Sequence, residues 1–511
     1  MNTPGPLERA FVCIVAVSIW ASSWLLGSSL LWAQWVMLGL CGLACVGGIW
    51  LYSSRSHGVV GAFRPWNGWV ASGLALATFV AFVGIQSANV SHIPVLETNN
   101  CTLFPVEHWR FLPSSIGGPF NGLANGFIPT ENAARYLLNY SAAALGIFAV
   151  MFGVQSRWSL RILIMVLAVH GLVSGAVCLA HQWSGSAKVL WVRGDPLLFL
   201  GAPFFFYKNQ NAAYQTLLAG WILGWWAAVS ARRPVRTPWL GLAVFVAAEV
   251  GLASIRSRAG MLFAGVLGVA WIIHQRHALE QWWRGRRGIM VFVLLVSVVA
   301  AGTALSRTGG LDTLRRFGAE ADLLRVGPHG GKIRMLEHQV ALKMFNDRPW
   351  FGWGAGSYLY NYAGYDAAVP EMASNRSGYS YYLLNPHADG DWYEFLAEFG
   401  IIGTFLFFFI WLPHLIWWVR KRAWAGPAMC MPALGVALVL SHGFIDSVLR
   451  NLAIFLVLGV SSALVTKSLN LRDRSEDVPG DRTQCAVRAT PGTSAPQAGG
   501  RSASRRETRW W

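Results

Sequence analysis

Long runs of apolar residues, separated by shorter polar connectors, dominate the pattern along the chain. Many of these runs have about 17–25 residues, which is the length that an α-helix needs to cross a bilayer. Backbone groups in lipid must be hydrogen-bonded within their own segment, so each run is expected to be helical. The pattern predicts an all-α polytopic membrane protein with about twelve transmembrane helices. They are expected near residues 7–26, 30–51, 69–85, 136–154, 162–181, 212–229, 239–253, 259–273, 289–305, 396–419, 429–444 and 452–465.

One long polar segment, residues 307–394, interrupts this alternation. It lies between two membrane-length runs, so it is expected to be held at a bilayer surface. The predicted organisation has spans 1–9 in residues 1–306, with an external loop at 86–132, and a catalytic segment at 307–395. Spans 10–12 follow in residues 396–469, and residues 470–511 form a basic tail rich in Ser, Gly and Pro that is expected to be disordered.

Basic residues gather in alternate connectors, which sets the expected orientation. Cytoplasmic loops of membrane proteins are enriched in Lys and Arg. If the N-terminus is cytoplasmic, every strongly basic connector is internal, and residues 86–132, 182–210 and 307–394 are external. Both termini are then cytoplasmic. The internal connectors carry Arg55 and Arg64; Arg157 and Arg161; Arg232, Arg233 and Arg236; Arg276, Arg284, Arg286 and Arg287; and Arg420, Lys421 and Arg422.

The composition supports a membrane protein and disfavours a nucleic-acid-binding one. Of the 511 residues, 54% are hydrophobic and 13% are charged, and the net charge is +17. A soluble domain has about twice that charged fraction. The positive charge is dispersed among the spans, which fits topology better than one nucleic-acid-binding face. The cysteines provide no external pair, so we expect neither a structural disulfide nor a metal site.

Within the long polar segment, residues 331–347 are predicted to form a helix. Leu336, Val340 and Met344 make an apolar stripe at helical spacing, and Arg334 and His338 lie one turn apart beside it. Pro349 should end this helix, and a glycine-rich loop follows. A second helix should begin near residue 391 and run straight into the next span. The external loop at 86–132, rich in Pro, Gly and Asn, is expected to be irregular.

Three external clusters could carry chemistry. Arg258, with Arg256 nearby, borders a span, and its planar fork suits diphosphate oxygens, although an interfacial arginine can also simply snorkel to water. Asn209 and Asn211, beside Lys208, could bind sugar or phosphate, or could cap a helix. Arg334 with His387 and Asp389 forms the third cluster.

His387 and Asp389 are the candidates for proton transfer. A histidine is a natural general base near neutral pH, and a carboxylate can orient it or take that role itself. An external histidine can also be an ordinary surface residue. Both residues precede the second predicted helix, whose N-terminus favours negative charge.

Several motifs, in order along the chain, resemble the bacterial O-antigen ligase and polysaccharide polymerase superfamily. They are Asn209-x-Asn211, Ser257-Arg258, and Arg334 followed by an Ala-Leu helix and a Pro-Gly-Gly turn. A His-containing segment then leads to Glu398-Phe-Gly400, and Asp446 and Arg450 fall in the last external turn. The resemblance covers roughly the second half of the chain.

The resemblance implies glycosyl transfer from an undecaprenyl-diphosphate-linked glycan to an acceptor hydroxyl at the periplasmic face of the bacterial inner membrane. The transfer would need no metal or cofactor and would invert the anomeric carbon. Arg258 and Arg334 would hold the diphosphate, which requires both on the same side of the membrane. Arg256, Lys208, Asn209, Asn211, Asp446 and Arg450 are expected to contact substrate.

The sequence departs from the family pattern at the catalytic histidine. Counting back from Glu398-Phe-Gly400, the histidine position falls on Asp389, and His387 lies two residues earlier. Either residue could be the base, with His387 slightly favoured. His338 occupies a position where the family often has an aromatic residue, so it is expected to pack.

Several functions remain open at this point. Polymerisation of O-antigen or exopolysaccharide repeat units is favoured over ligation to lipid A-core and over protein O-glycosylation. The partners implied are the lipid-linked donor, a glycan or lipid A-core acceptor and membrane lipids, with chain-length regulators or export proteins as further candidates. A lipid-linked-sugar transporter or flippase is the rival of another class, and a scaffolding membrane protein is the third alternative.

Overall fold

The structure is a computed structural model, and most of the residues that it describes are helical. It describes residues 4–56, 68–97, 100–118, 123–124, 128–129, 132–186, 188–191, 203–230, 247–248, 255, 257–276, 331–366 and 387–476. The predicted spans at 239–253 and 289–305 therefore lie outside the described residues, apart from 247–248. So does the tail after residue 476.

Eight helices in the described part of the chain are long and apolar enough to cross a membrane. The chain is thus a multi-pass membrane protein, as the apolar pattern predicts. Helix α15 continues past the predicted tail boundary at residue 470. The eight are α1 (Pro6–Trp24), α2 (Leu31–Ser56), α3 (Gly68–Ala88), α4 (Ala133–Gly153), α5 (Arg157–Trp183), the helix Arg258–Arg276, α13 (Asp391–Arg420) and α15 (Leu452–Glu476).

Two further helices coincide with predicted spans but differ from the eight in length or polarity. Helix α14 (Pro427–His442) has only 16 residues, and α6 (Lys208–Ser230) is rich in polar side chains yet almost entirely buried. The two helices pack together through small residues. A Cβ at Gly220 would lie 2.7 Å from the carbonyl oxygen of Met431, so only glycine permits this approach. Buried polar residues explain why α6 departs from a simple lipid-facing helix.

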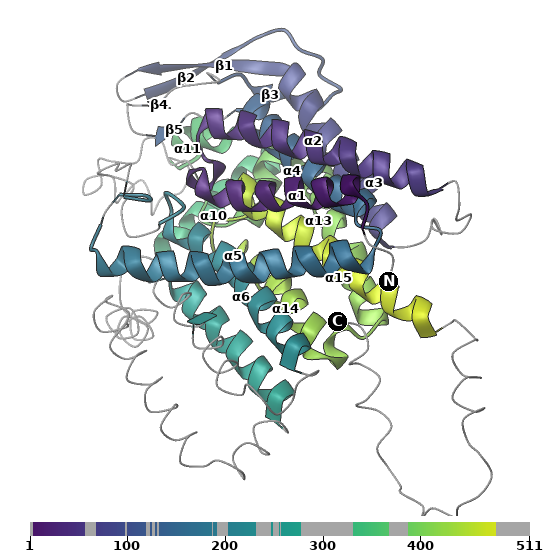
Figure 1. Cartoon of the computed structure of the whole chain (residues 1–511). Coiled ribbons are helices and arrows are strands. Elements are labelled where there is room, and N and C mark those ends of the chain that lie inside the picture. The colour runs from purple at the N-terminus through teal and green to yellow at the C-terminus, as the bar shows by residue number, and fades with distance from the viewer. Residues whose placement is uncertain are drawn as a thin grey trace, which may run out of the picture.

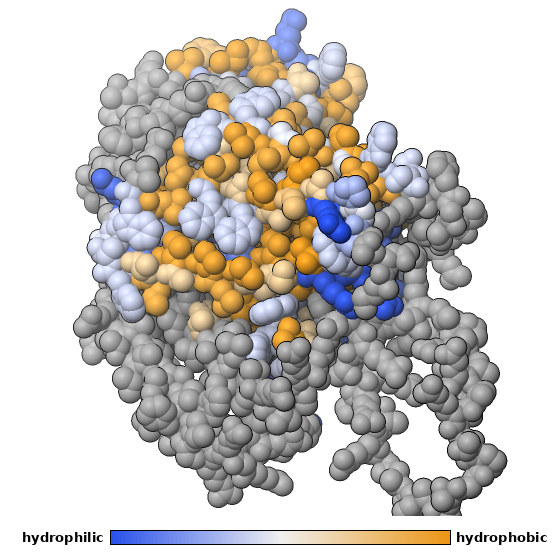
Figure 2. Space-filling model, in the orientation of Figure 1, coloured by the Kyte–Doolittle hydropathy of each residue, from blue (hydrophilic) through white to orange (hydrophobic). Residues whose placement is uncertain are grey.

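The outer helices present apolar side chains rather than charge. Helices α1, α2 and α5 run side by side across Figure 1, and Figure 2 shows apolar residues spread over the same face. On α2, Leu43, Val46 and Trp50 are each more than half exposed. Such a surface would be an aggregation hazard in water and is what lipid contact requires.

The loop after α3 contains strands, so the prediction of irregular structure there, and of an all-α fold, is wrong. Strands β1 (Val90–Glu97) and β2 (Asn100–Pro105) pair antiparallel, and β3 (Ser115–Ile116) adds to β1 in parallel. Strands β4 (Leu123–Ala124) and β5 (Ile128–Pro129) form a second small sheet. Val90, Ile93 and Val95 are β-branched residues that favour a strand, although the Pro and Asn content of the loop obscured this.

Asn89, the residue after α3, anchors this loop. Its side-chain Nδ2 donates to the backbone carbonyl oxygens of Trp109, Leu112 and Pro113, and its side-chain Oδ1 accepts from the Trp109 N–H. One buried asparagine therefore satisfies four backbone groups that no strand pairs. These bonds take the place of the strand-to-strand backbone hydrogen bonds that residues 109–113 lack.

Helices α10 (Gly331–Asp347) and α11 (Tyr358–Asp366) form the polar segment's described core beside the start of α13 (Figure 1). Helix α10 has the predicted bounds, and its stripe of Leu336, Val340 and Met344 is buried against Tyr358 and Tyr362. Burial of that stripe fixes which face of α10 remains for Arg334.

Helix α13 begins at Asp391 as predicted, but it does not run straight into the span. Gly400 has φ +61°, and the helix is broken there. The glycine-rich loop fills the break: Trp353 N–H donates to Ala397 O (3.0 Å), and Gly354 N–H donates to Glu398 O (2.8 Å). On the other side, Ile401 N–H donates to the carbonyl oxygen of Pro349 (2.8 Å). The loop supplies the backbone partners that the helix loses.

Candidate active site

A cluster of carboxylates surrounds Arg334, the cation that α10 carries. Its Nε donates to Asp389 Oδ2 at 3.3 Å, and one terminal nitrogen lies 3.6 Å from Asp446 Oδ2. The other terminal nitrogen donates to the carbonyl oxygen of Ile445 at 3.3 Å. The side chains of Arg334 and Asp389 are about a third exposed (32% and 34%), whereas Asp446 is 2% exposed. The guanidinium is therefore fixed in place, with one side still open to solvent.

Asp446 is the hub that joins this cluster to α6. Its Oδ2 accepts hydrogen bonds from the Asn209 side-chain amide and, at 3.3 Å, from the Tyr207 hydroxyl. Asn209 in turn accepts a hydrogen bond from Ser257 Oγ at 2.8 Å. Continuous polar contacts thus lead from Arg334 to Ser257, the residue before Arg258.

Burial and charge shape the ionisation of this cluster. Burial, reinforced by the charge of Asp389, raises the pKa of Asp446 to about 6, although Arg334 acts in the opposite direction. Burial alone would lower the pKa of Arg334, but Asp446 and Asp389 outweigh it and raise that pKa. Burial and the Asp446 charge raise the pKa of Tyr207. Arg334 therefore stays charged, and Asp446 holds its proton more tightly than an ordinary aspartate.

The short segment before α13 is held by packing from α10. Asp389 has φ +48°, an uncommon backbone conformation for a residue other than glycine. His338 stacks on Tyr393, with ring centroids 4.0 Å apart, and its Nε2 lies 3.3 Å from the carbonyl oxygen of Asp389. A Cβ at Gly390 would lie 2.7 Å from that same Nε2. His338 thus packs, as expected, and fixes the turn that presents Asp389.

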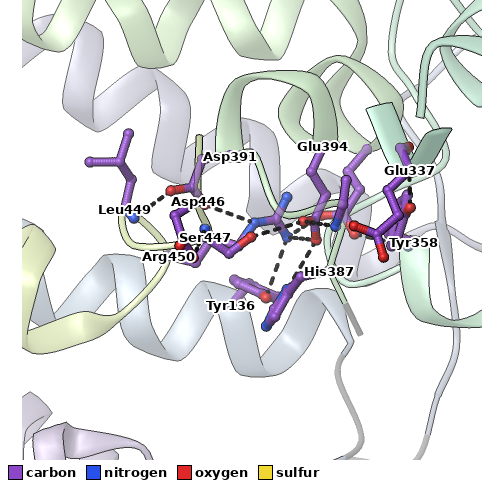
Figure 3. Close-up of polar contacts among 12 residues, drawn as sticks. Tyr136, Glu337, Tyr358, His387, Asp391, Glu394, Asp446, Ser447, Leu449 and Arg450 are labelled. Carbon is purple, nitrogen blue, oxygen red and sulfur yellow. Dashed lines mark hydrogen bonds and ion pairs between the residues drawn. The ribbon is translucent and has the colours of Figure 1, made fainter. Parts of the chain in front are cut away.

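His387 belongs to a second cluster, centred on a buried carboxylate. Its Nδ1 lies 3.3 Å from Glu394 Oε1, and the backbone N–H of Ala388 donates to Glu394 Oε2 at 2.9 Å (Figure 3). Glu394 is fully buried, whereas the His387 side chain is 26% exposed. Glu394 therefore holds the Nδ1 edge of the imidazole ring against the protein.

Arg450 lies on the other side of Glu394 and is nearly surrounded by acid groups. Its guanidinium is 3.0 Å from Glu394, 2.7 Å from Glu398 and 3.5 Å from Asp391 (Figure 3). Burial alone would lower the pKa of Arg450, but the carboxylates of Glu394 and Glu398 raise it well above its usual value. With 5% of the residue exposed, Arg450 is buried among these carboxylates, and its predicted contact with substrate stays a prediction.

The carboxylates outnumber Arg450, so backbone groups supply the remaining stabilisation. Asp391 Oδ2 accepts from the N–H groups of Val448 (2.6 Å) and Leu449 (2.7 Å). Glu398 Oε1 accepts from the N–H of Tyr358 at 2.9 Å. These bonds tie the last loop, α11 and the first turns of α13 into one unit.

The structure brings together most of the predicted site residues that it describes. Arg334, Asp389, Asp446 and Asn209 share one network, and half-buried Arg258 follows Ser257, which belongs to it. Lys208 begins α6 beside Asn209. His387 and Arg450 belong to the second cluster, around Glu394, and Asn211 belongs to neither.

Asn211 points away from the network. It is fully buried, and its amide donates to Cys178 Sγ of α5 at 3.4 Å. Arg256 lies outside the described residues. The described part of the chain contains no group of three or more His, Cys, Asp and Glu residues that could hold a metal ion.

Sequence reasoning missed Glu394 and Tyr207 as site residues. Glu394 lies one helical turn into α13, and an acidic residue in the first turn is also what an ordinary helix N-terminus favours. Tyr207 lies next to the Lys208–Asn211 cluster but carries no motif of its own. Only the fold shows that these side chains face His387 and Asp446.

Residues 241–408 match the sequence profile of the O-antigen ligase family. This stretch is a domain of the O-antigen ligase family. Members of the family transfer glycans from lipid carriers, so the match agrees with the resemblance in the motifs. No curated protein matches the chain.

The ligase domain does not contain the whole cluster. It includes Arg258, Arg334, His387 and Asp389, whereas the segments holding Asn209, Asp446 and Arg450 lie outside residues 241–408. Helix α6 and the loop before α15 therefore complete the network that the ligase domain begins.

Proposed function

We propose that the chain transfers a glycan from undecaprenyl diphosphate to an acceptor hydroxyl, and that it extends O-antigen or exopolysaccharide repeat units. The observation that carries this proposal is the continuous polar network from Arg334 through Asp446 and Asn209 to Ser257. It supports convergence of Arg334 and Arg258 on one lipid-linked diphosphate.

The two arginines stabilise the leaving group. A guanidinium presents several donors in a fixed plane and binds phosphate oxygens in pairs. As the bond between the anomeric carbon and the diphosphate oxygen breaks, its electrons pass to that oxygen, where the cations balance the added charge. Arg334 is partly exposed and is held by Asp389, Asp446 and the carbonyl oxygen of Ile445, so it needs little rearrangement to contact the headgroup.

His387 is the base, and Asp389 positions Arg334. With Nδ1–H donated to Glu394, the Nε2 atom of His387 is the acceptor. It takes the proton of the acceptor hydroxyl while that oxygen forms the new bond to the anomeric carbon. Asp389 instead pairs with Arg334. Displacement from the opposite face inverts the anomeric carbon, and linkage analysis of donor and product tests this stereochemistry.

The site lies on the periplasmic side in this proposal, with both termini in the cytoplasm. The donor's prenyl chain remains in the bilayer, where the exposed apolar surface of the helices supports lipid contact. Ligation to lipid A-core and protein O-glycosylation share this chemistry and differ in the acceptor. A deletion strain separates them: a core capped by one repeat indicates a polymerase, and an uncapped core indicates a ligase.

Transport is a second candidate function, and the buried polar residues between α1, α5 and α6 are the observation that supports it. His170, inside α5, lies 3.2 Å from Ser23 Oγ and 3.0 Å from the Tyr214 hydroxyl. Ionisable groups within spans often line transport pathways. The clustering around Arg334 and His387 nevertheless favours an enzyme, because transport does not require a base beside a diphosphate site.

Arg258→Ala distinguishes the two functions. Loss of one transition-state donor commonly costs about 100- to 1,000-fold in rate. An enzyme then accumulates unpolymerised single repeats on the outer leaflet, whereas a flippase accumulates them on the inner leaflet. Arg276→Ala, at the other end of the same helix, is the matched control and should preserve long chains.

A further inference from the structure

Arg334 is shared by two carboxylates that differ sharply in their contact with water. Asp389 is 34% exposed, so its charge can be solvated if Arg334 turns to another anion. Asp446 is 2% exposed and has no comparable access to water. When an anionic ligand binds Arg334, water can therefore still stabilise the charge of Asp389 but not that of Asp446.

Asp446 cannot move away, because several elements hold it. The Tyr207 hydroxyl and the Asn209 amide both donate to its Oδ2, and the N–H of Ser447 donates to its Oδ1 at 2.9 Å. Its backbone is also fixed: its N–H donates to His442 O at 3.0 Å, and its carbonyl oxygen accepts from Asp391 N at 3.3 Å.

Arg334 is the cation that pairs with Asp446, and the other titratable groups around Asp446 come from several elements. Arg334 comes from α10, Asp389 from the turn before α13, and Tyr207 directly precedes α6. On α13, Glu394 accepts from Ser447 Oγ at 3.4 Å, so it adds a second carboxylate nearby. His442 precedes Asp446 by one turn and is fully buried.

We propose that Asp446 takes up one proton when the donor's diphosphate binds Arg334, so that donor binding is coupled to protonation. This inference rests on the proposed function of the site. The diphosphate oxygens share the guanidinium charge and bring negative charge toward a carboxylate that neither water nor movement can relieve. Protonation from solvent removes that repulsion.

The ionisation of Asp446 agrees with this coupling. Burial first, and then Asp389, already raises the pKa of Asp446 to about 6. Bound diphosphate raises it further, because an added anion disfavours the charged form. At pH 7.5 Asp446 is therefore deprotonated without the donor and protonated with it. Asp446 is a positioning residue that acts through Arg334.

Calorimetry of the full-length protein in nanodiscs tests the coupling. The probe is farnesyl-diphosphate-linked N-acetylglucosamine, a diphosphate diester that does not itself titrate near neutral pH. Binding heats at pH 7.5 in buffers of different ionisation enthalpy measure proton uptake. Wild type should take up close to one proton per probe bound, and its affinity should weaken about tenfold per pH unit above pH 6 until the occupied site titrates.

Two variants assign the proton. Asp446→Asn should bind with almost no proton uptake and a flat pH dependence, whereas Asp389→Asn should keep the uptake. Binding by wild type without proton uptake, or undiminished uptake by Asp446→Asn, would overturn the inference alone. Failure of wild type to bind the probe at any pH would overturn the proposed function as well.

Discussion

The different roles proposed for His387, as the base, and Asp389, as the partner of Arg334, give the sharpest test of the site. His387→Gln keeps a polar side chain of similar size but removes the base, whereas Asp389→Asn keeps the shape of the carboxylate and removes its charge. In the structure, Glu394 orients His387 and Arg334 pairs with Asp389. The two changes should therefore affect different steps.

The structure sets the relative size of the two effects. A positioned general base contributes about 100- to 10,000-fold to rate, so His387→Gln should lower kcat by at least 100-fold. The Arg334–Asp389 pair is about a third exposed at both side chains (32% and 34%), and a pair of this kind contributes at most about 1 kcal/mol, or roughly fivefold. Asp389→Asn should thus cost less than tenfold and act mainly on KM.

The assay measures polymer formation by purified protein in nanodiscs, with lipid-linked donor varied at fixed acceptor. Products are separated by gel and identified by mass spectrometry. Thermal unfolding of each variant controls for misfolding. A kcat loss larger for Asp389→Asn than for His387→Gln, with both proteins folded, would assign the base to Asp389 and refute the assignment made from Glu394.

Two further predictions concern the scaffold beneath the site. Gly400→Ala should lower the unfolding temperature markedly, because Gly400 has φ +61° and an added Cβ would lie 2.5 Å from the carbonyl carbon of Trp350. Gly39→Ala in α2 is the control. No atom lies within 4 Å of a Cβ added there, so this change should not destabilise the protein. Arg450→Met should destabilise by about 3–5 kcal/mol, since it leaves buried carboxylates without their cation, and adding Glu398→Gln should restore part of the loss. Thermal melts of detergent-solubilised protein check both, and an Arg450→Met protein as stable as wild type would show that the carboxylates are neutral.

The residue pattern determined the local features of this protein. Runs of apolar residues identified the membrane helices, because crossing lipid demands a helix of fixed length. The stripe of Leu336, Val340 and Met344 located α10, whose observed bounds equal the predicted ones. The ordered motifs also identified the family, which the match over residues 241–408 supports.

The strands after α3 and the break in α13 depended on tertiary contacts. Asn89 satisfies backbone groups that come 20 or more residues later, and the glycine-rich loop fills the break at Gly400 from some 50 residues away. Helical or alternating periodicity is a property of neighbouring residues, so it carries no information about such pairings.

Only the tertiary structure decided which polar residues face one another. Packing places Arg450 among buried carboxylates and brings Glu394 to His387 across a turn. Asp446 joins Asn209 to Arg334 because α6, α10 and the loop before α15 meet there. A side chain's chemical type is encoded locally, but its partner and its access to water arise from packing between distant segments.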